Sequence, residues 1–191
     1  SVPSRFTPFL SVALQFQVLN VVWKFGLPVP EPMLLLSESD GLGEGYIMSA
    51  VEGETSPKSI LNEPEFECAR GKIIGQSAEI LATLHSLPTD EFSFLGGVPD
   101  SLDAVSAQIK YYDGYGQPHP ALEYAYRWLD INRPDFFCQR KSLVHGDYRN
   151  GNLIVDPQKG ISAVLDWECS FLGDFHADLA WFCMRSWRQK R

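Results

Sequence analysis

Large apolar residues gather in runs that glycine and proline separate along the chain. Residues 11–25 are dense in valine, leucine and aromatic side chains, and Gly26 and two prolines follow. Glycine and proline directly after an apolar run are helix-stop signals, so we expect a buried helix here. The next two runs, residues 33–36 and 46–51, enclose a polar segment with three glycines, which predicts a small hairpin of two strands.

Helical spacing of apolar residues returns in the middle of the chain. It predicts a helix over residues 64–87, ended by Pro88, and another from Leu122 that stops before Pro134. The segment between them, residues 89–120, is rich in glycine, proline and aspartate and contains three tyrosines. We expect this segment to be a loop with one or two helical turns.

The last third of the chain begins with three short apolar runs. Residues 142–144, 153–155 and 161–165 have the length and composition of strands, and a proline- and glycine-containing turn joins the second to the third. Residues 179–187 then predict an apolar helix at the end of the chain. Helices and hairpins therefore alternate without an internal repeat.

Charge and composition narrow the class of protein. The chain has 191 residues, of which 24 are acidic and 16 basic, and a net charge of −8. This acidity excludes a basic nucleic-acid-binding surface as the default. Apolar residues make up 45% and aromatic residues 13% of the chain, which is enough for a packed core and too much for a disordered segment.

The cysteines and the absence of long apolar runs bear on location. Cys68, Cys138, Cys169 and Cys183 form no Cys-x-x-Cys pair and have no histidine at zinc-ligand spacing, so neither a structural zinc nor a disulfide framework is expected. Free thiols indicate a reducing compartment. No run approaches the length of a membrane span, and no secretory pattern opens the chain. We expect a cytoplasmic protein without a membrane or nucleic-acid partner.

One polar segment carries candidate chemistry. Residues 145–152 read His-Gly-Asp-Tyr-Arg-Asn-Gly-Asn between two predicted strands, and Asp166 ends the hairpin that follows. In phosphoryl transfer, one carboxylate accepts a hydroxyl proton, while an amide oxygen and a second carboxylate hold Mg²⁺ against the phosphates. Asp147, Asn152 and Asp166 supply these groups in that order.

The alternative is that these residues are ordinary. Asp147 and Asn152 are common turn residues, and Asp166 could be a helix cap. The protein-kinase motif H-R-D-x-x-x-x-N has the same Asp-to-Asn spacing, with arginine where Gly146 stands here, and a metal-binding aspartate at the next strand end. Both pieces in order, with a hairpin between them, favour the catalytic interpretation.

Three segments together, residues 143–155, 163–168 and 173–181, resemble the aminoglycoside phosphotransferase family of protein-kinase-like enzymes. The Asp-Trp-Glu sequence at 166–168 is more similar to the broad bacterial and choline kinase-like branch than to the antibiotic-resistance enzymes. The kinase-like domains fused to acyl-CoA dehydrogenases belong to that more similar group.

The resemblance implies an α+β, protein-kinase-like fold. Residues 1–52 would form a reduced N-terminal lobe of one helix plus a β-hairpin. Residues 53–191 would form a mostly helical C-terminal lobe that carries the catalytic loop and a metal-binding hairpin. The implied reaction is Mg²⁺-dependent transfer of the γ-phosphoryl group of ATP, or of GTP, to a hydroxyl of a small molecule.

The resemblance also implies roles for single residues. Asp147 would be the catalytic base that orients the acceptor hydroxyl, and Asn152 and Asp166 would be the Mg²⁺ ligands. Arg149 is a second candidate catalytic residue, which would contact the γ-phosphate; a solvated side chain and an ion pair with Glu168 are equal alternatives.

Further roles concern the hinge and the support of the loop. The nucleotide base would dock on the hinge backbone of Ser49, Ala50 and Val51. His145 would hold the catalytic loop by hydrogen bonding, and Asp178 would brace the same loop from the following helix. An ordinary acidic residue in a first helical turn is the alternative for Asp178.

The chain departs from the family pattern before its first helix. A complete kinase has a glycine-rich loop and a strand lysine there, whereas only residues 1–10 stand there in this chain. The glycines of residues 41–45 lack the required spacing and are typical of a hairpin turn, and Gln15 stands where relatives have an ion-pairing glutamate. We therefore expect a fragment or a divergent member, with a catalytically inactive, pseudokinase-like binding module as the alternative function.

Both ends of the chain carry apolar residues that additional elements cover in relatives. They are Phe9, Leu10 and Val12 at one end and Trp181, Phe182 and Trp187 at the other. Large contiguous apolar patches mark an interface or an aggregation liability. We expect either a homodimer that buries these surfaces or a poorly soluble chain.

Overall fold

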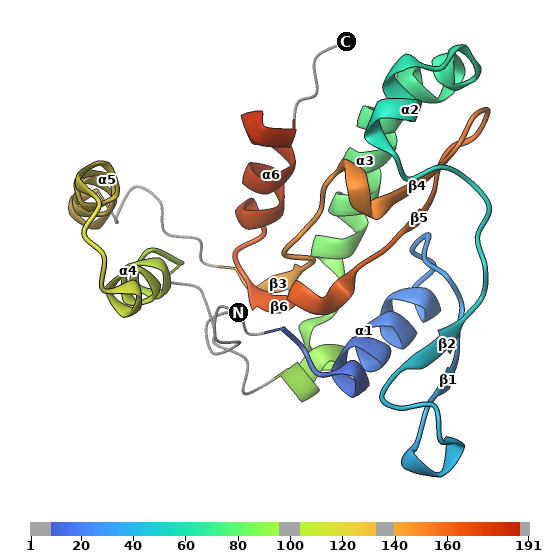
Figure 1. Cartoon of the computed structure of the whole chain (residues 1–191), viewed down its shortest axis with the longest axis horizontal. Helices are drawn as coiled ribbons and strands as arrows, with labels where there is room; N and C mark the ends of the chain where they lie inside the picture. Colours follow the sequence, from blue (N-terminus) through green and yellow to red (C-terminus); the bar gives the residue numbers. More distant parts are fainter. Residues whose placement is uncertain (1–8, 96–103, 133–139, 188–191) are drawn as a thin grey trace.

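The computed structural model describes residues 9–95, 104–132 and 140–187 (Figure 1). A helix and a hairpin come first: α1 (Val12–Lys24), β1 (Pro32–Leu35) and β2 (Tyr46–Met48). The remaining elements are α2 (Pro57–Asn62), α3 (Glu67–Ser86), α4 (Ala104–Tyr115), α5 (Pro120–Ile131), β3 (Ser142–Val144), β4 (Leu153–Asp156), β5 (Gly160–Val164), β6 (Phe171–Gly173) and α6 (His176–Cys183). None of the helices in the described ranges has the length and hydrophobicity that a membrane span requires.

The first helix and the first hairpin confirm the sequence prediction for this region. The Ser11 hydroxyl accepts a hydrogen bond from the Leu14 backbone N–H at 3.4 Å at the start of α1, and Gly26 adopts a φ of +79° directly after its end. The helix buries Val18, Leu19 and Val22 and packs against β1. Strands β1 and β2 pair in antiparallel orientation, so helix and hairpin form one small lobe.

Helix α3 is the longest described helix and crosses the C-terminal part of the molecule. It begins three residues after Pro64, because residues 64–66 form a 3₁₀ turn, and it ends before Pro88 as predicted. One face, with Leu81, Leu84 and His85 among its buried residues, packs against the strands β3 and β5. His85, on this face, contacts the site described below, and Figure 1 shows α3 alongside the β4–β5 hairpin.

The described strands pair as three antiparallel two-stranded sheets, β1–β2, β3–β6 and β4–β5. The predicted strands β3, β4 and β5 are confirmed, and β3 and β4 are almost completely buried. The β4–β5 turn is closed by the Asp156 carboxylate, which accepts hydrogen bonds from the backbone N–H groups of Gln158 and Lys159 at 2.8 and 2.7 Å. Strand β6 was not expected, since its three residues carry no strand pattern of their own.

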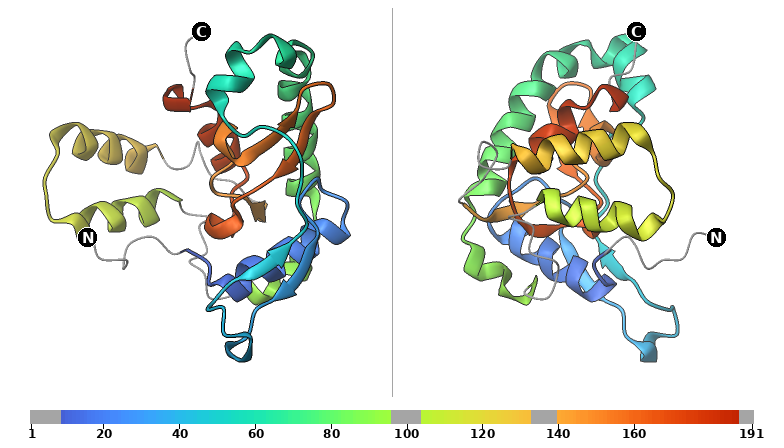
Figure 2. Two further views of the ribbon diagram at one scale, coloured as in Figure 1. Left: turned by 45° about the vertical axis from the view of Figure 1, so that its right-hand side comes forward. Right: turned by 90° about the vertical axis from the view of Figure 1, so that its left-hand side faces the viewer.

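The expectation of a loop over residues 89–120 is wrong for its second half, where α4 forms. Its partly buried positions Val105, Ile109 and Tyr112 recur at helical spacing, and glycine and proline lie mostly on either side of the helix. The Tyr112 ring packs against Tyr126 of α5 with centroids 5.3 Å apart, and its hydroxyl donates to Glu123 at 3.0 Å. Figure 2 shows α4 and α5 side by side as a helical hairpin. The contact between the two helices therefore stabilises α4, which the local sequence pattern did not predict.

Two further helices differ from the prediction. The short helix α2 was not expected; Ser56 caps its N-terminus and Pro57 occupies its first turn. The last helix was expected over residues 179–187, whereas α6 covers His176–Cys183 and a 3₁₀ turn follows. It begins earlier because the Asp174 carboxylate accepts a hydrogen bond from the His176 backbone N–H at 2.9 Å.

The expectation for the apolar ends is only partly met. Phe9 is 51% exposed, but Leu10 is buried and its backbone N–H donates to the Glu168 carbonyl at 2.7 Å. Trp181 and Trp187 are half-buried and pack against each other with ring centroids 5.4 Å apart. The most exposed apolar side chains of the first lobe lie on its hairpin instead, with Met33 63% and Leu42 72% exposed. The homodimer stays a prediction.

Candidate active site

Residues 145–152 form a turn between the buried strands β3 and β4, as the sequence predicted. Gly146 adopts a φ of +83°, and a Cβ at this position would collide with the carbonyl oxygen of Cys169. A side chain is therefore excluded by both conformation and space. This explains why glycine stands where the kinase motif has arginine.

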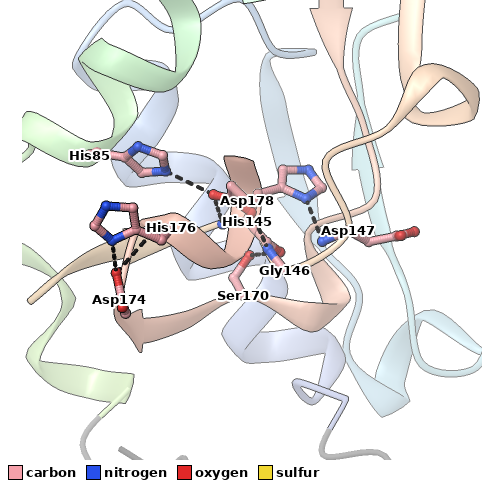
Figure 3. Close-up of polar contacts among 8 residues, drawn as sticks. All are labelled: His85, His145, Gly146, Asp147, Ser170, Asp174, His176 and Asp178. Carbon is pink, nitrogen blue, oxygen red and sulfur yellow. Dashed lines mark hydrogen bonds and ion pairs between the residues drawn. The ribbon is translucent and has the colours of Figure 1, made fainter. Parts of the chain in front are cut away.

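The backbone of this turn is held by one buried carboxylate from α6. Asp178 is fully buried and accepts hydrogen bonds from the backbone N–H groups of His145 and Gly146, both at 2.9 Å. The Nε2–H of His85, on α3, donates to the same carboxylate at 2.9 Å (Figure 3). The expected bracing role of Asp178 is confirmed, and its three donors come from two distant parts of the chain.

His145 lies under the turn and has no exposed surface. Its Nε2–H donates to the Leu165 carbonyl at 3.0 Å, and its Nδ1 accepts the backbone N–H of Asp147 at 3.2 Å. Burial lowers the pKa of His145, an effect that the negative charge of Asp178 partly opposes, so the ring is neutral around neutral pH. The predicted structural role of His145 is confirmed.

Three side chains donate hydrogen bonds to the carboxylate of Asp147. The Nε–H of Arg149 is shared between Oδ1 and Oδ2, at 3.1 and 3.0 Å. The Nδ2 group of Asn152 donates to Oδ2 at 2.7 Å, and the indole Nε1–H of Trp181 donates to Oδ1 at 2.7 Å. Of the alternatives for Arg149, the ion pair with Glu168 is not the one that forms; the partner is Asp147.

Trp181 is the site residue that sequence reasoning missed. It was assigned to an apolar surface, because tryptophan in a helix next to other large apolar residues is typical of packing. Its indole N–H reaches a carboxylate 34 residues earlier in the chain. Only its position three residues after Asp178, on the same helix face, could have suggested that it also meets the turn of residues 145–152.

Asn152 is oriented by its own turn. Its Nδ2 group donates both to the Asp147 carbonyl, at 2.9 Å, and to the Asp147 carboxylate, so both amide hydrogens are used. The backbone carbonyl of Asn152 accepts a hydrogen bond from the Leu165 N–H at 2.8 Å, which ties the turn to the residue before Asp166. No hydrogen bond to the side-chain oxygen of Asn152 occurs among the described residues, so this oxygen can serve another ligand.

Asp166 lies two residues after the end of β5 and has an exposed side chain. It is the only non-glycine residue in the described ranges with a positive φ, 68°. Aspartate tolerates this left-handed conformation better than most residues, and such outliers concentrate at functional sites. Of the candidate site residues, Asp147 and Asn152 therefore precede β4, and Asp166 follows β5.

Negative charge accumulates around this hairpin end. The pKa of Glu168 is raised, first by burial and then by the neighbouring charges of Asp166 and Asp147. Burial and the same three acids raise the pKa of the Cys169 thiol to about 11. No three histidine, cysteine or acidic side chains of the described residues form a complete metal site by themselves. The negative charge and the free oxygens fit a cation that takes its remaining ligands from phosphate.

The expected hinge follows β2. The backbone N–H of Ser49 donates to the Glu31 carbonyl at 2.9 Å, and its hydroxyl accepts the Glu31 N–H at 2.8 Å, so Ser49 closes the hairpin. The chain then contacts β4 where Glu54 and Val155 exchange two backbone hydrogen bonds of 2.9 Å. Ala50 and Val51, between these points, make no backbone hydrogen bond within the described part of the chain.

A separate hollow lies between α4 and α5. It has a volume of about 370 Å³ and is lined mainly by uncharged polar and aromatic side chains, which are Gln108, Tyr111, Tyr112, Tyr115, Gln117, Pro118, His119, Leu122 and Tyr126. The tyrosine cluster of residues 111–115 lines this hollow, and the Tyr112 hydroxyl donates to Glu123 of α5.

Comparison with known proteins agrees with this geometry. The sequence model of the phosphotransferase enzyme family matches residues 2–191. The human protein "Acyl-CoA dehydrogenase family member 11" is 34% identical over 177 residues, which cover 89% of this chain and 22% of that protein. The mouse protein "Acyl-CoA dehydrogenase family member 10" is 30% identical, over 91% of this chain and 17% of its own length. The chain thus spans about a fifth of these curated relatives.

Solved structures share the fold. An aminoglycoside phosphotransferase-like structure from Ralstonia eutropha is 25% identical, with a TM-score of 0.67 over 91% of this chain and 54% of that one. The GDP complex of aminoglycoside 2'-phosphotransferase-IIIa is 16% identical, with a TM-score of 0.66 over 88% of this chain and 59% of that one. The fold is the protein-kinase-like α+β fold that the motifs predicted, and the chain belongs to the phosphotransferase enzyme family.

Proposed function

We propose that this chain transfers the γ-phosphoryl group of ATP or GTP to a hydroxyl group of a small molecule. The observation that carries the proposal is the braced turn of residues 145–152, which presents the Asp147 carboxylate with its orientation set by donors from three residues. Related folds have been solved as complexes named for GDP and for streptomycin with ATP, which supports a nucleotide co-substrate.

In this reaction Asp147 orients the acceptor hydroxyl. The hydroxyl oxygen attacks the γ-phosphorus, the bond from the γ-phosphorus to the bridging oxygen breaks, and the nucleoside diphosphate leaves. The hydroxyl proton passes to the Asp147 carboxylate. Such catalysis consists mostly of positioning and charge stabilisation, which suits a carboxylate that is already held in place.

The residues present fit a magnesium ion. The side-chain oxygen of Asn152 is not used by its own turn, and Asp166 presents an exposed carboxylate beside other acidic groups. Mg²⁺ is commonly bound by one or two protein oxygen ligands together with substrate phosphates. When bound, the ion would neutralise charge on the phosphates; Asn152 and Asp166 would hold it.

Arg149 has donors to spare for a phosphate. Its Nε–H is bonded to Asp147, and no hydrogen bond of its terminal guanidinium nitrogens occurs among the described residues. The guanidinium lies over the Trp187 ring, 5.1 Å from its centroid, which limits its movement. We propose that these terminal nitrogens contact the γ-phosphate.

For the nucleotide base, fewer hinge residues remain available than the sequence predicts. Ser49 uses its N–H within the hairpin, so Ala50 and Val51 carry the backbone groups that remain for the base. Gly53 allows the chain to turn onto β4 next to them, since its φ is +142° and a Cβ there would collide with Ile154. The proposed acceptor is a small-molecule alcohol, and the hollow between α4 and α5 is a candidate for part of its binding site.

Calorimetric titration with Mg²⁺-ATP and Mg²⁺-GTP, followed by an assay of Mg²⁺-dependent hydrolysis, tests the proposal. The Asp147→Asn variant should lower kcat roughly 10²- to 10⁴-fold with unchanged nucleotide affinity, whereas Asp166→Ala should weaken binding of the metal-nucleotide. An affinity no tighter than millimolar without hydrolysis would reject the enzyme and favour the inactive binding module.

A further inference from the structure

The indole of Trp181 makes one of the two shortest contacts to the proposed base. Its Nε1 lies 2.7 Å from Oδ1 of Asp147, which is as short as the contact from Asn152 to Oδ2. A distance of about 2.7 Å is typical of a charge-assisted hydrogen bond to a carboxylate. Arg149 contacts both oxygens at longer distances, 3.0 and 3.1 Å. Each carboxylate oxygen thus has one short, separate donor.

The helix that carries Trp181 is held to the same turn by a second contact. Asp178 lies three residues earlier on α6 and accepts the backbone N–H groups of His145 and Gly146. Residues three apart share one face of a helix. One face of α6 therefore contacts the turn twice: Asp178 holds its backbone, and Trp181 holds the side-chain carboxylate of Asp147. The helix thus fixes the position of that carboxylate relative to the backbone of the turn.

The Trp181 ring is itself fixed by packing. It contacts the Trp187 ring at a centroid distance of 5.4 Å, and the guanidinium of Arg149 lies over the other tryptophan. The ring is half-buried, whereas the indoles of Trp23 and Trp128 are 41% and 49% exposed. A rigid donor of this kind sets the direction of a carboxylate more firmly than a flexible side chain does.

We propose that Trp181 is a positioning residue for Asp147. Its indole N–H fixes Oδ1 while Asn152 fixes Oδ2, so the plane of the carboxylate is set before the acceptor binds. The shared, longer contact from Arg149 is then the one that an acceptor hydroxyl replaces. This inference rests on the proposed function only for its consequence in catalysis; the contact itself can be tested without activity.

The first test is a ¹⁵N–¹H spectrum of the indole groups of the intact chain, which has five tryptophans. The Trp181→Phe variant identifies the Trp181 signal by its loss. Replacing Asp147 by asparagine removes the charged acceptor, so Asp147→Asn should move that proton signal upfield and leave the signal of the distant, exposed Trp23 in place. An unchanged Trp181 signal in Asp147→Asn overturns the proposal, whether or not the chain is active.

The second test is kinetic. Trp181→Phe keeps an aromatic ring against Trp187 but removes the N–H donor, so kcat should fall roughly 10- to 100-fold, as expected for a hydrogen bond to a charged group. The KM and Kd for Mg²⁺-ATP should not change, and the control Trp23→Phe should have unchanged kcat. A normal kcat in Trp181→Phe rejects the positioning role. An inactive chain that still shows the Asp147→Asn shift rejects the proposed function and supports the positioning of the carboxylate.

Discussion

The turn of residues 145–152 and the hairpin β1–β2 are both short and both contain a positive-φ glycine, yet they are held in different ways. Asp178 of α6 accepts hydrogen bonds from the backbone of the turn, His85 of α3 donates to Asp178, and the Leu165 carbonyl just after β5 accepts a hydrogen bond from His145. The strands on either side of the turn are almost completely buried. The turn is therefore fixed by the tertiary structure.

The hairpin is held mainly by its own residues. Its strands pair with each other, and its connection is closed locally, where the Asp40 carboxylate accepts the Ser37 backbone N–H at 2.7 Å. Among the described elements, α1 packs against β1, and the apolar side chains of the hairpin are largely exposed. Those that are at least 37% exposed are Met33, Leu34, Leu35, Leu42, Ile47 and Met48.

The two regions are suited to different tasks: the turn to chemistry and the hairpin to contact with a partner. A turn with many independent supports can present its side chains in one orientation, which is what electrostatic preorganisation requires. A hairpin with exposed apolar side chains offers a surface to another partner or element. Changes in the turn should therefore propagate through the fold, whereas changes in the hairpin should stay local.

The largest effect is expected from Asp178→Ala. The change removes a fully buried acceptor of two backbone N–H groups and of the buried His85 side chain. Loss of one partner of a buried charged network costs about 3–5 kcal/mol of the free energy of unfolding, which urea denaturation measures. Asp174→Ala, which removes the acceptor of the His176 backbone N–H at the start of α6, is the matched control and should cost about 1 kcal/mol. Equal losses would contradict the central role of Asp178.

A pair of glycine substitutions compares the two regions directly. Gly146 and Gly41 have φ values of +83° and +65°, but a Cβ meets the Cys169 carbonyl in the first case and nothing within 4 Å in the second. Gly146→Ala combines backbone strain with a collision and should cost about 2–4 kcal/mol, whereas Gly41→Ala should cost about 1 kcal/mol. Thermal or urea unfolding of both variants measures these two losses of stability. Similar losses would mean that the turn can relax as easily as the hairpin.

The smallest effect is a dependence of stability on pH. Burial lowers the pKa of His145 in the folded chain, so below about pH 6.5 the unfolded chain binds a proton that the folded chain does not. The stabilisation that comes from keeping His145 neutral is fully present above that pH and is lost as the pH falls toward the pKa of His145 in the folded chain. The slope reaches at most about 1.4 kcal/mol per pH unit.

Urea unfolding at pH 7.5, 6.5 and 5.5 measures this slope. The variant His145→Gln should reduce it, and His119→Gln, in the exposed residue before α5, should not. A pH-independent unfolding free energy in the wild-type chain would show that His145 is protonated without loss of the turn.

Local pattern was sufficient where neighbours in the chain decide the structure. The helix α1, the β1–β2 hairpin and the β4–β5 hairpin followed from apolar runs bounded by glycine and proline. It failed for α4, whose partly buried face is completed by α5, and for β6, which pairs with β3. In both cases the stabilising contact comes from a segment that the local pattern does not contain.

The candidate site likewise has a part that the sequence predicts and a part that depends on contacts between distant segments. Sequence alone determined the order and spacing of Asp147, Asn152 and Asp166, because a turn and the following hairpin place residues a few positions apart near one another. The conformation of the turn decided that Arg149 pairs with Asp147 rather than with Glu168, and only the tertiary structure decided that Trp181 donates to Asp147. An indole is both an apolar ring and a hydrogen-bond donor, and which property is used depends on the group that packing brings to it from elsewhere in the chain.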